Sequence, residues 1–250
     1  MASGAHPKTT VLELAGAQNF PSEVSDAMRR YRTRGASVKI NMVLGEPPRY
    51  EGVSEAEQQM MMSAGVNICP SIDYLERAWQ DATLGKPADR PYVEAELPSH
   101  VDSSLTDDGT YVMTMFTQYG PPREEDWPEG ARERYADACI ESLARFAPNL
   151  PGAILEREVL APPDLERIFG LVDGSIFQGE QDLAQMAFMR PVSGLAQYAT
   201  PVHGLYLCGA GTHPGGGVMA ASGHNAAQRI LRDRRRGGLR RRLRRSVASA

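Results

Sequence analysis

The chain has 250 residues, of which 42% are apolar and 23% are charged, as in an ordinary globular protein of one or two domains. No stretch approaches the ~18 consecutive apolar residues of a membrane span, and the first residues lack the apolar core of a secretory signal. The three cysteines lie far apart without a CxxC pair, which argues against a disulfide framework or a structural zinc site. We therefore expect a reducing compartment: the cytoplasm, or the mitochondrial matrix if the source is a eukaryote.

The charge is distributed unevenly along the chain. From Arg229 onward, ten arginines and one aspartate give a net charge of +9, whereas the preceding 228 residues carry 17 basic and 30 acidic side chains, a net charge of −13. An acidic body argues against nucleic acid as a partner. Residues 233–250 are predicted to be a basic disordered tail, and a weak contact with an anionic membrane surface is the alternative role for it.

Apolar periodicity and turn residues predict the elements in chain order. Ser71 is the predicted N-cap of a helix that ends at Gly85, and residues 107–109 are a predicted turn. Because strands and helices do not alternate regularly, we expect an α/β protein whose middle part is an α+β domain with a mixed, largely antiparallel sheet. Strands are predicted at 9–14, 37–44, 92–97, 111–119, 156–160 and 205–208, and helices at 22–34, 71–84, 131–146, 163–169 and 218–231.

A glycine-rich turn follows the last predicted strand. Five glycines fall within the nine residues 209–217, directly before the last predicted helix. Glycine lets a ligand approach the backbone closely, and the start of a helix offers free N–H groups and a positive dipole end to an anion. The turn departs from the Rossmann fingerprint, since Pro214 stands where the third glycine is expected. It predicts one edge of a dinucleotide-type cofactor site; glycines that serve packing alone are the alternative.

The segment GLYLCGAGTHPGGGVMAASGHNAA, residues 204–227, resembles the C-terminal FAD motif of phytoene desaturase-like flavoproteins in the amine-oxidase-like superfamily. The resemblance is strongest to the branch of pyridine nucleotide-disulfide oxidoreductase domain-containing proteins, and it covers nearly all of residues 1–230. Further segments that carry it are KINMVL at 39–44, FTQYGP at 116–121, PPDLERIFGL at 162–171, GSIFQGE at 174–180 and MRPVSG at 189–194.

The resemblance implies an FAD-dependent oxidoreductase, a dehydrogenase or isomerase of an apolar small molecule. Such proteins begin with a GxGxxG half that binds the ADP part of FAD, and no segment here matches it, so that half is an implied partner. A non-catalytic interaction module and one subunit of a split flavoenzyme are the alternatives. The implied parts are a strand returning from the FAD domain at 1–18, a substrate domain at 19–195, the strand, turn and helix of an incomplete Rossmann-like FAD domain at 196–232, and the tail at 233–250.

The resemblance also assigns the cofactor contacts. The backbone of residues 209–212 would lie near the ribityl and pyrophosphate groups, and residues 217–219 near the pyrimidine edge of the flavin. No catalytic side chain is assigned, and no histidine or carboxylate spacing indicates a metal. Arg190 faces the flavin or substrate in one interpretation and forms a structural ion pair in the other. The predicted cofactor-binding residues are Gly209, Ala210, Gly211, Thr212, His213, Gly215, Gly216, Gly217, Val218 and Met219.

Overall fold

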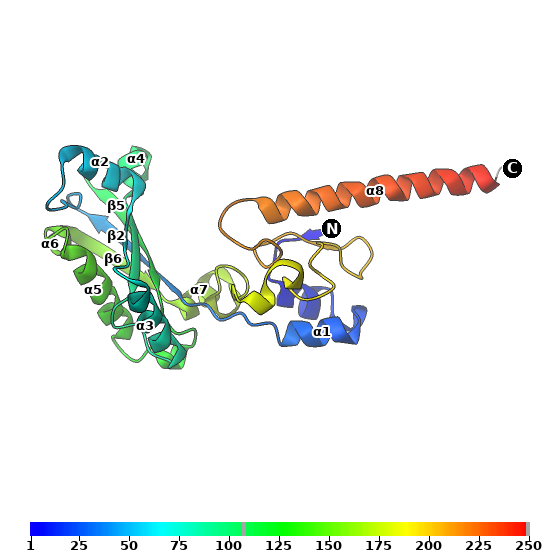
Figure 1. Cartoon of the computed structure of the whole chain (residues 1–250), viewed down its shortest axis with the longest axis horizontal. Coiled ribbons are helices and arrows are strands. Elements are labelled where there is room, and N and C mark those ends of the chain that lie inside the picture. The colour runs from blue at the N-terminus through cyan, green and yellow to red at the C-terminus, as the bar shows by residue number, and fades with distance from the viewer. Residues whose placement is uncertain (107–108, 249–250) are drawn as a thin grey trace. The chain divides into compact units, whose positions relative to one another are not determined.

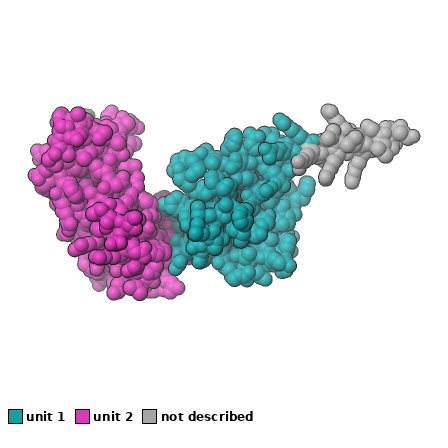
Figure 2. Space-filling model, viewed as in Figure 1, with its two compact units in different colours: residues 1–34, 175–250 teal, residues 35–174 magenta. Residues whose placement is uncertain are grey.

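The computed structural model describes the backbone of residues 1–106 and 109–248 and the side chains up to residue 235. The predicted turn at 107–109 therefore lies partly outside the described residues. The chain forms two compact units (Figures 1 and 2). We call residues 35–174, from the middle of the sequence, the middle unit. Residues 1–34 and 175–250, from the two ends of the sequence, form the outer unit. The middle unit is shorter at both ends than the predicted substrate domain of residues 19–195.

The middle unit is built on a five-stranded sheet of order β3-β4-β5-β2-β6 in which every neighbouring pair is antiparallel. The longest pairing joins β2 and β5 over eight residues each, from Ser37–Gln118 to Leu44–Tyr111. This confirms the predicted α/β class with an antiparallel sheet. The strands are β2 (Ser37–Leu44), β3 (Val66–Ile68), β4 (Tyr92–Glu96), β5 (Tyr111–Gln118) and β6 (Ile154–Leu160).

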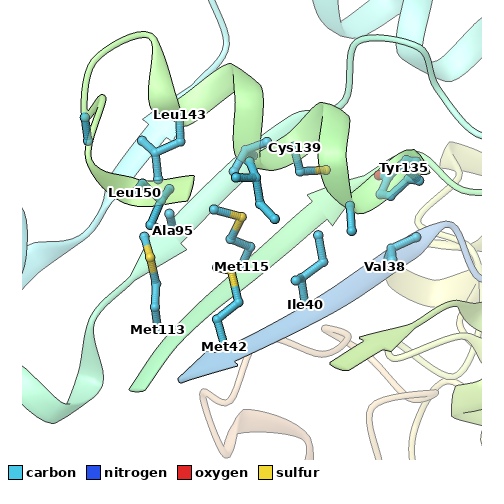
Figure 3. Packing of buried hydrophobic residues seen from close by; sticks show 14 of the residues in the cluster. Val38, Ile40, Met42, Ala95, Met113, Met115, Tyr135, Cys139, Leu143 and Leu150 are labelled. Atoms are coloured by element: carbon cyan, nitrogen blue, oxygen red, sulfur yellow. The ribbon is translucent and has the colours of Figure 1, made fainter. Parts of the chain in front are cut away.

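The core of the middle unit lies between this sheet and helix α5 (Ala131–Ala144). Side chains alternate between the two faces of a strand, and the even-numbered residues of β2 from Val38 to Leu44 are buried. They pack in one cluster with Cys139 and Leu143 of α5 (Figure 3). Burial raises the pKa of the Cys139 thiol to about 12. The other helices of this unit are α2 (Glu55–Ala64), α3 (Ile72–Thr83), α4 (Pro98–Val101), α6 (Leu150–Ala153) and α7 (Pro162–Phe169), with short 3-10 turns at η3 (Ser103–Leu105), η4 (Glu124–Asp126) and η5 (Val172–Gly174).

The outer unit contains a two-stranded parallel sheet, in which Ala2 pairs with Tyr206 and Ser3 with Leu207. A predicted strand at 9–14 is wrong, because this segment forms the π-helical η1. Two consecutive residues of this segment, Thr10 and Val11, are both buried, whereas a half-buried strand would bury alternate residues. The elements of the outer unit are β1 (Ala2–Ser3), η1 (Thr9–Leu14), η2 (Ala17–Asn19), α1 (Ser22–Arg29), η6 (Leu183–Gln185), η7 (Ala187–Met189), β7 (Tyr206–Leu207) and α8 (Ala221–Ala248).

Helix α8 differs from its prediction at both ends. It begins at Ala221 rather than at residue 218, since Val218 and Ala220 adopt left-handed φ angles of 55° and 54° that no α-helix contains. It continues to Ala248, because no proline interrupts the segment and the glycines at 237 and 238 only lower helix propensity. The predicted tail at 233–250 therefore overlaps the end of this helix. Among the residues described, no helix is both long and apolar enough to cross a bilayer.

Candidate cofactor-binding site

The first half of the glycine-rich turn packs against the chain's own first residues. A Cβ atom on Gly209 would lie 2.6 Å from the Gly4 carbonyl oxygen, and one on Gly211 would overlap the ring of Pro7. No side chain fits into such a contact, so these two glycines are required for packing. The first two glycines of the turn therefore allow close contact with the chain's first residues.

The backbone polar groups of this first half are also occupied within the protein. The Gly211 N–H donates to the Gln178 side chain at 3.1 Å, while the amide of Gln178 donates to the Gly4 carbonyl at 3.1 Å. The Thr212 N–H donates to the Gly209 carbonyl at 3.0 Å. Gln178 therefore connects the turn to the segment that follows β1.

Arg190 is fully buried and holds the turn from the other side. Its guanidinium donates to the Ala210 carbonyl at 3.0 Å and to the Phe177 carbonyl at 2.7 Å. Further bonds reach the carbonyls of Gly179, Glu180 and Gln185. Burial lowers its pKa from the usual arginine value. Since Arg190 forms no ion pair within the described residues, the ion-pair interpretation is wrong. The charge is balanced by carbonyl dipoles, and the side chain positions Ala210.

The second half of the turn is exposed. Residues 217–220 all lie on the surface, and the Val218 side chain is fully accessible. A β-branched residue at a φ of 55° is strained by ~1–3 kcal/mol. Gly217, at a φ of 118°, carries no such cost. Strained, exposed backbone of this kind is concentrated at ligand sites in proteins.

Hydroxyl groups donate to carbonyls of the turn, whereas those N–H groups of the turn that follow residue 215 find no acceptor among the described residues. The Ser222 hydroxyl donates to the His213 carbonyl at 3.2 Å. The Tyr198 hydroxyl donates to the same carbonyl at 2.9 Å and accepts from the Asn225 amide at 2.9 Å. By contrast, the N–H groups of residues 216–223 have no acceptor among the described residues. These donors, at the N-terminus of α8, suit an anionic or carbonyl-bearing ligand.

The His213 side chain contributes a further unsatisfied group. Its Nδ1 atom is enclosed and has no hydrogen-bond partner within the described residues. Buried polar atoms in proteins are nearly always hydrogen-bonded. The orphaned Nδ1 and the free N–H groups together fit the polar edge of a flavin, which carries both donors and acceptors.

The geometry separates the predicted cofactor residues into two groups. Residues 209–212 are held by Gly4, Pro7, Gln178 and Arg190, and residues 216–219 are open with free N–H groups.

Sequence reasoning missed Gln178, Tyr198, Ser222 and Asn225. Gln178 is a polar residue within a segment that carries the family resemblance, but its partner lies 33 residues away, and the local pattern contains no sign of that contact.

The chain is similar in sequence to several proteins whose names describe oxidoreductases. It is 37% identical over 238 residues to pyridine nucleotide-disulfide oxidoreductase domain-containing protein 2 of Rattus norvegicus, covering 92% of this chain and 41% of that protein. It is 34% identical over 114 residues to a limonene dehydrogenase polypeptide of Castellaniella defragrans, covering 45% of this chain and 21% of that protein. It is 36% identical over 127 residues to a lycopene-forming phytoene desaturase of Paracoccus sp., covering 49% of this chain and 24% of that protein.

These similarities confirm the resemblance that the glycine-rich segment predicts. No family model matches the chain. The chain spans about two fifths of the length of the rat relative. The relatives are named as oxidoreductases, and their activities bear on this chain only as a basis for a proposal.

Proposed function

We propose that the chain forms the flavin-contacting part of an FAD-dependent oxidoreductase that dehydrogenates or isomerises an apolar substrate. The observation that carries this proposal is the run of free N–H groups from Gly216 to Gly223, next to the strained and exposed Val218. A turn used only for packing would be buried, whereas residues 217–220 are exposed and their N–H groups are accessible to a ligand.

The residues of the open half would hold the isoalloxazine edge. The N–H groups of residues 216–219 would donate to its carbonyl and nitrogen acceptors, and the positive end of α8 would favour negative charge at this edge when the flavin is reduced. Val218 and Met219 would supply apolar contact. When bound, FAD supplies hydride acceptance, so few catalytic side chains are needed. Residues 209–212 would shape the turn and approach the ribityl and pyrophosphate groups.

The proposed substrate is apolar. Limonene and phytoene, which appear in the names of two relatives, are hydrocarbons without a polar group for a protein to recognise. Catalysis on such molecules depends on an apolar channel and on orientation against the flavin rather than on acid–base groups.

A second proposal is that the chain works as one subunit of a split flavoenzyme or as a non-catalytic interaction module. The observation that favours it is that these 250 residues contain no GxGxxG segment. As one subunit of a split flavoenzyme, the chain would take that segment from a partner polypeptide.

Flavin titration tests the proposed function. The intact chain is titrated with FAD alone and in the presence of the part of the rat relative that this chain does not match, with flavin fluorescence as the readout. We expect a colourless chain that binds little FAD alone and quenches its fluorescence once the second polypeptide is added. Absence of flavin binding by a folded mixture of the two would contradict the proposal.

A matched pair of variants at Met219 sharpens this test. Met219→Glu places a carboxylate beside the free N–H groups, and Met219→Gln is the neutral control of similar size. Because Met219 is 55% exposed, neither change disturbs the core. Met219→Glu should weaken binding of reduced flavin about tenfold relative to Met219→Gln; equal affinities would place the flavin edge elsewhere.

A further inference from the structure

Helix α8 connects the candidate site to the basic segment. It starts directly after the exposed residues 217–220 and runs without interruption from Ala221 to Ala248 (Figure 1). The distance along the helix axis from Ala221 to Leu239 is ~27 Å at 1.5 Å per residue. The arginines from Arg229 onward therefore belong to the same helix that begins at the proposed flavin contact.

The helix carries many more positive than negative side chains. Asp233 is the one acid from Arg229 onward, and it accepts an ion pair from Arg229 at 3.0 Å and a hydrogen bond from Tyr206. Arg232, Arg234 and Arg235 are exposed, and none forms an ion pair with any residue whose side chain is described. An exposed run of like charges without internal partners costs free energy that an external anionic surface would recover.

The spacing of apolar residues in the helix adds a second feature. Leu239, Leu243 and Val247 follow one another at intervals of four residues, and five arginines lie between the first and the last of them. Since the backbone is helical to Ala248, four-residue intervals place these three positions within ~80° of one another around the helix axis. A basic helix with one narrow apolar stripe is typical of segments that lie on a membrane surface.

We propose that α8 binds the surface of an anionic lipid bilayer through residues 229–247. Charge complementarity calls for an anionic partner, because the helix carries ten arginines and one acid from Arg229 onward. The apolar stripe favours a bilayer over a nucleic acid as that partner. A leucine stripe has no use on a phosphate backbone, whereas it enters the boundary between headgroups and acyl chains.

Membrane contact would bring the proposed flavin site close to its apolar substrate, and this benefit rests on the proposed function. An apolar substrate partitions into the bilayer, and a helix that lies on the surface would hold the exposed turn at residues 217–220 close to that reservoir. The contact itself needs neither flavin nor substrate.

Vesicle co-sedimentation of the intact chain tests the proposal. Vesicles with 30% phosphatidylglycerol in phosphatidylcholine are compared with pure phosphatidylcholine, at low and high salt. Because several arginines near an anionic surface each strengthen binding, we expect at least tenfold stronger binding to the anionic vesicles and a loss of binding at high salt. Equal binding to both vesicle types, or none to either, would overturn the proposal.

Three variants separate charge from the apolar stripe. Replacing Arg240, Arg241, Arg242, Arg244 and Arg245 by glutamine should weaken binding at least tenfold, and the same five replaced by lysine should retain it. Leu239→Ser, Leu243→Ser and Val247→Ser combined should weaken binding several-fold at unchanged charge. Circular dichroism confirms the fold of each variant. If the serine variant binds like the original and duplex DNA displaces the vesicles, the partner is a nucleic acid and the proposal is wrong.

Flavin titration, done beside the vesicle experiment, distinguishes failure of the membrane proposal from failure of the proposed function. A chain that binds anionic vesicles but never binds flavin would retain the membrane role and lose the oxidoreductase role. A chain that binds flavin with its partner polypeptide but ignores vesicles would do the reverse.

Discussion

The two units of the molecule differ in what holds them together. Among the described residues, the core cluster of the middle unit contains 23 buried apolar residues, and that of the outer unit contains eight. The middle unit has strands of up to eight residues in continuous register, whereas the outer unit has two strands of two residues each. Apolar burial therefore contributes more to the middle unit, while in the outer unit polar contacts through Arg190 and Gln178 add to a smaller apolar cluster.

Backbone strain follows the same division. Of the non-glycine residues with positive φ among those described, Gln178, Ala187, Tyr198, Val218 and Ala220 lie in the outer unit, and Asp173 lies in the middle unit. Each such residue costs ~1–3 kcal/mol and persists where surrounding contacts force it. The comparison shows a stable sheet domain beside a strained unit that carries the candidate site.

The largest loss of stability is expected from Arg190→Met in the outer unit. Removing the guanidinium leaves the buried carbonyls of Phe177 and Ala210 without donors, which should destabilise the outer unit by about 4 kcal/mol. Limited proteolysis should then cleave within residues 175–220 and spare the middle unit. Arg190→Lys, which keeps one charged donor, is the control and should lose less. Proteolysis unchanged in Arg190→Met would show that the carbonyl contacts contribute little.

Leu143→Ala is the corresponding experiment on the middle unit. Leu143 is fully buried between α5 and the sheet (Figure 3), so its truncation should lower the unfolding free energy of the middle unit by about 3 kcal/mol. Urea denaturation followed by hydrogen exchange should show weaker protection in β2 and β5. Protection near Arg190 should not change; a parallel loss in both units would mean that they unfold as one and would break the comparison.

Gly211→Ala is expected to have an intermediate effect. The added methyl group would overlap the ring of Pro7, and relief of the overlap should cost about 1–3 kcal/mol in the outer unit. Thermal unfolding measures the change. Gly223→Ala, at an exposed helical glycine with open space around it, is the matched control and should be neutral or stabilising. A neutral Gly211→Ala would contradict the contact between the turn and the first residues.

The smallest effect is expected from Val218→Asn. Asparagine tolerates the left-handed region better than a β-branched residue does, and the exposed Val218 side chain has no packing to lose. The outer unit should gain about 0.5–1 kcal/mol, visible as a small rise in its thermal midpoint. A decrease would indicate that the valine side chain contributes to folding and that strain is not stored at this position.

The local sequence pattern predicted an element correctly where the pattern of that element alone shows which of its faces is buried. Four strands of the middle unit, β2, β4, β5 and β6, were predicted near their observed bounds, because alternating apolar residues such as those of β2 can bury only one face. The three-residue strand β3 was missed. Helix α2 was missed, although Ser54 and Glu57 form the capping box that Ser-x-x-Glu spacing indicates. The apolar pattern of η1 was misread as a strand, since six residues fit either period.

The sequence by itself determined the family resemblance, the antiparallel sheet and the segment in which a cofactor edge is expected. Only the tertiary structure decided that Gly209 and Gly211 contact the protein's own chain, while residues 216–219 keep free N–H groups. It also decided that Arg190 binds carbonyls rather than a carboxylate. The physical reason is distance along the chain: the partners of Gly209 and Gly211 lie some 200 residues away in sequence, and local propensities carry no information about contacts that folding alone creates.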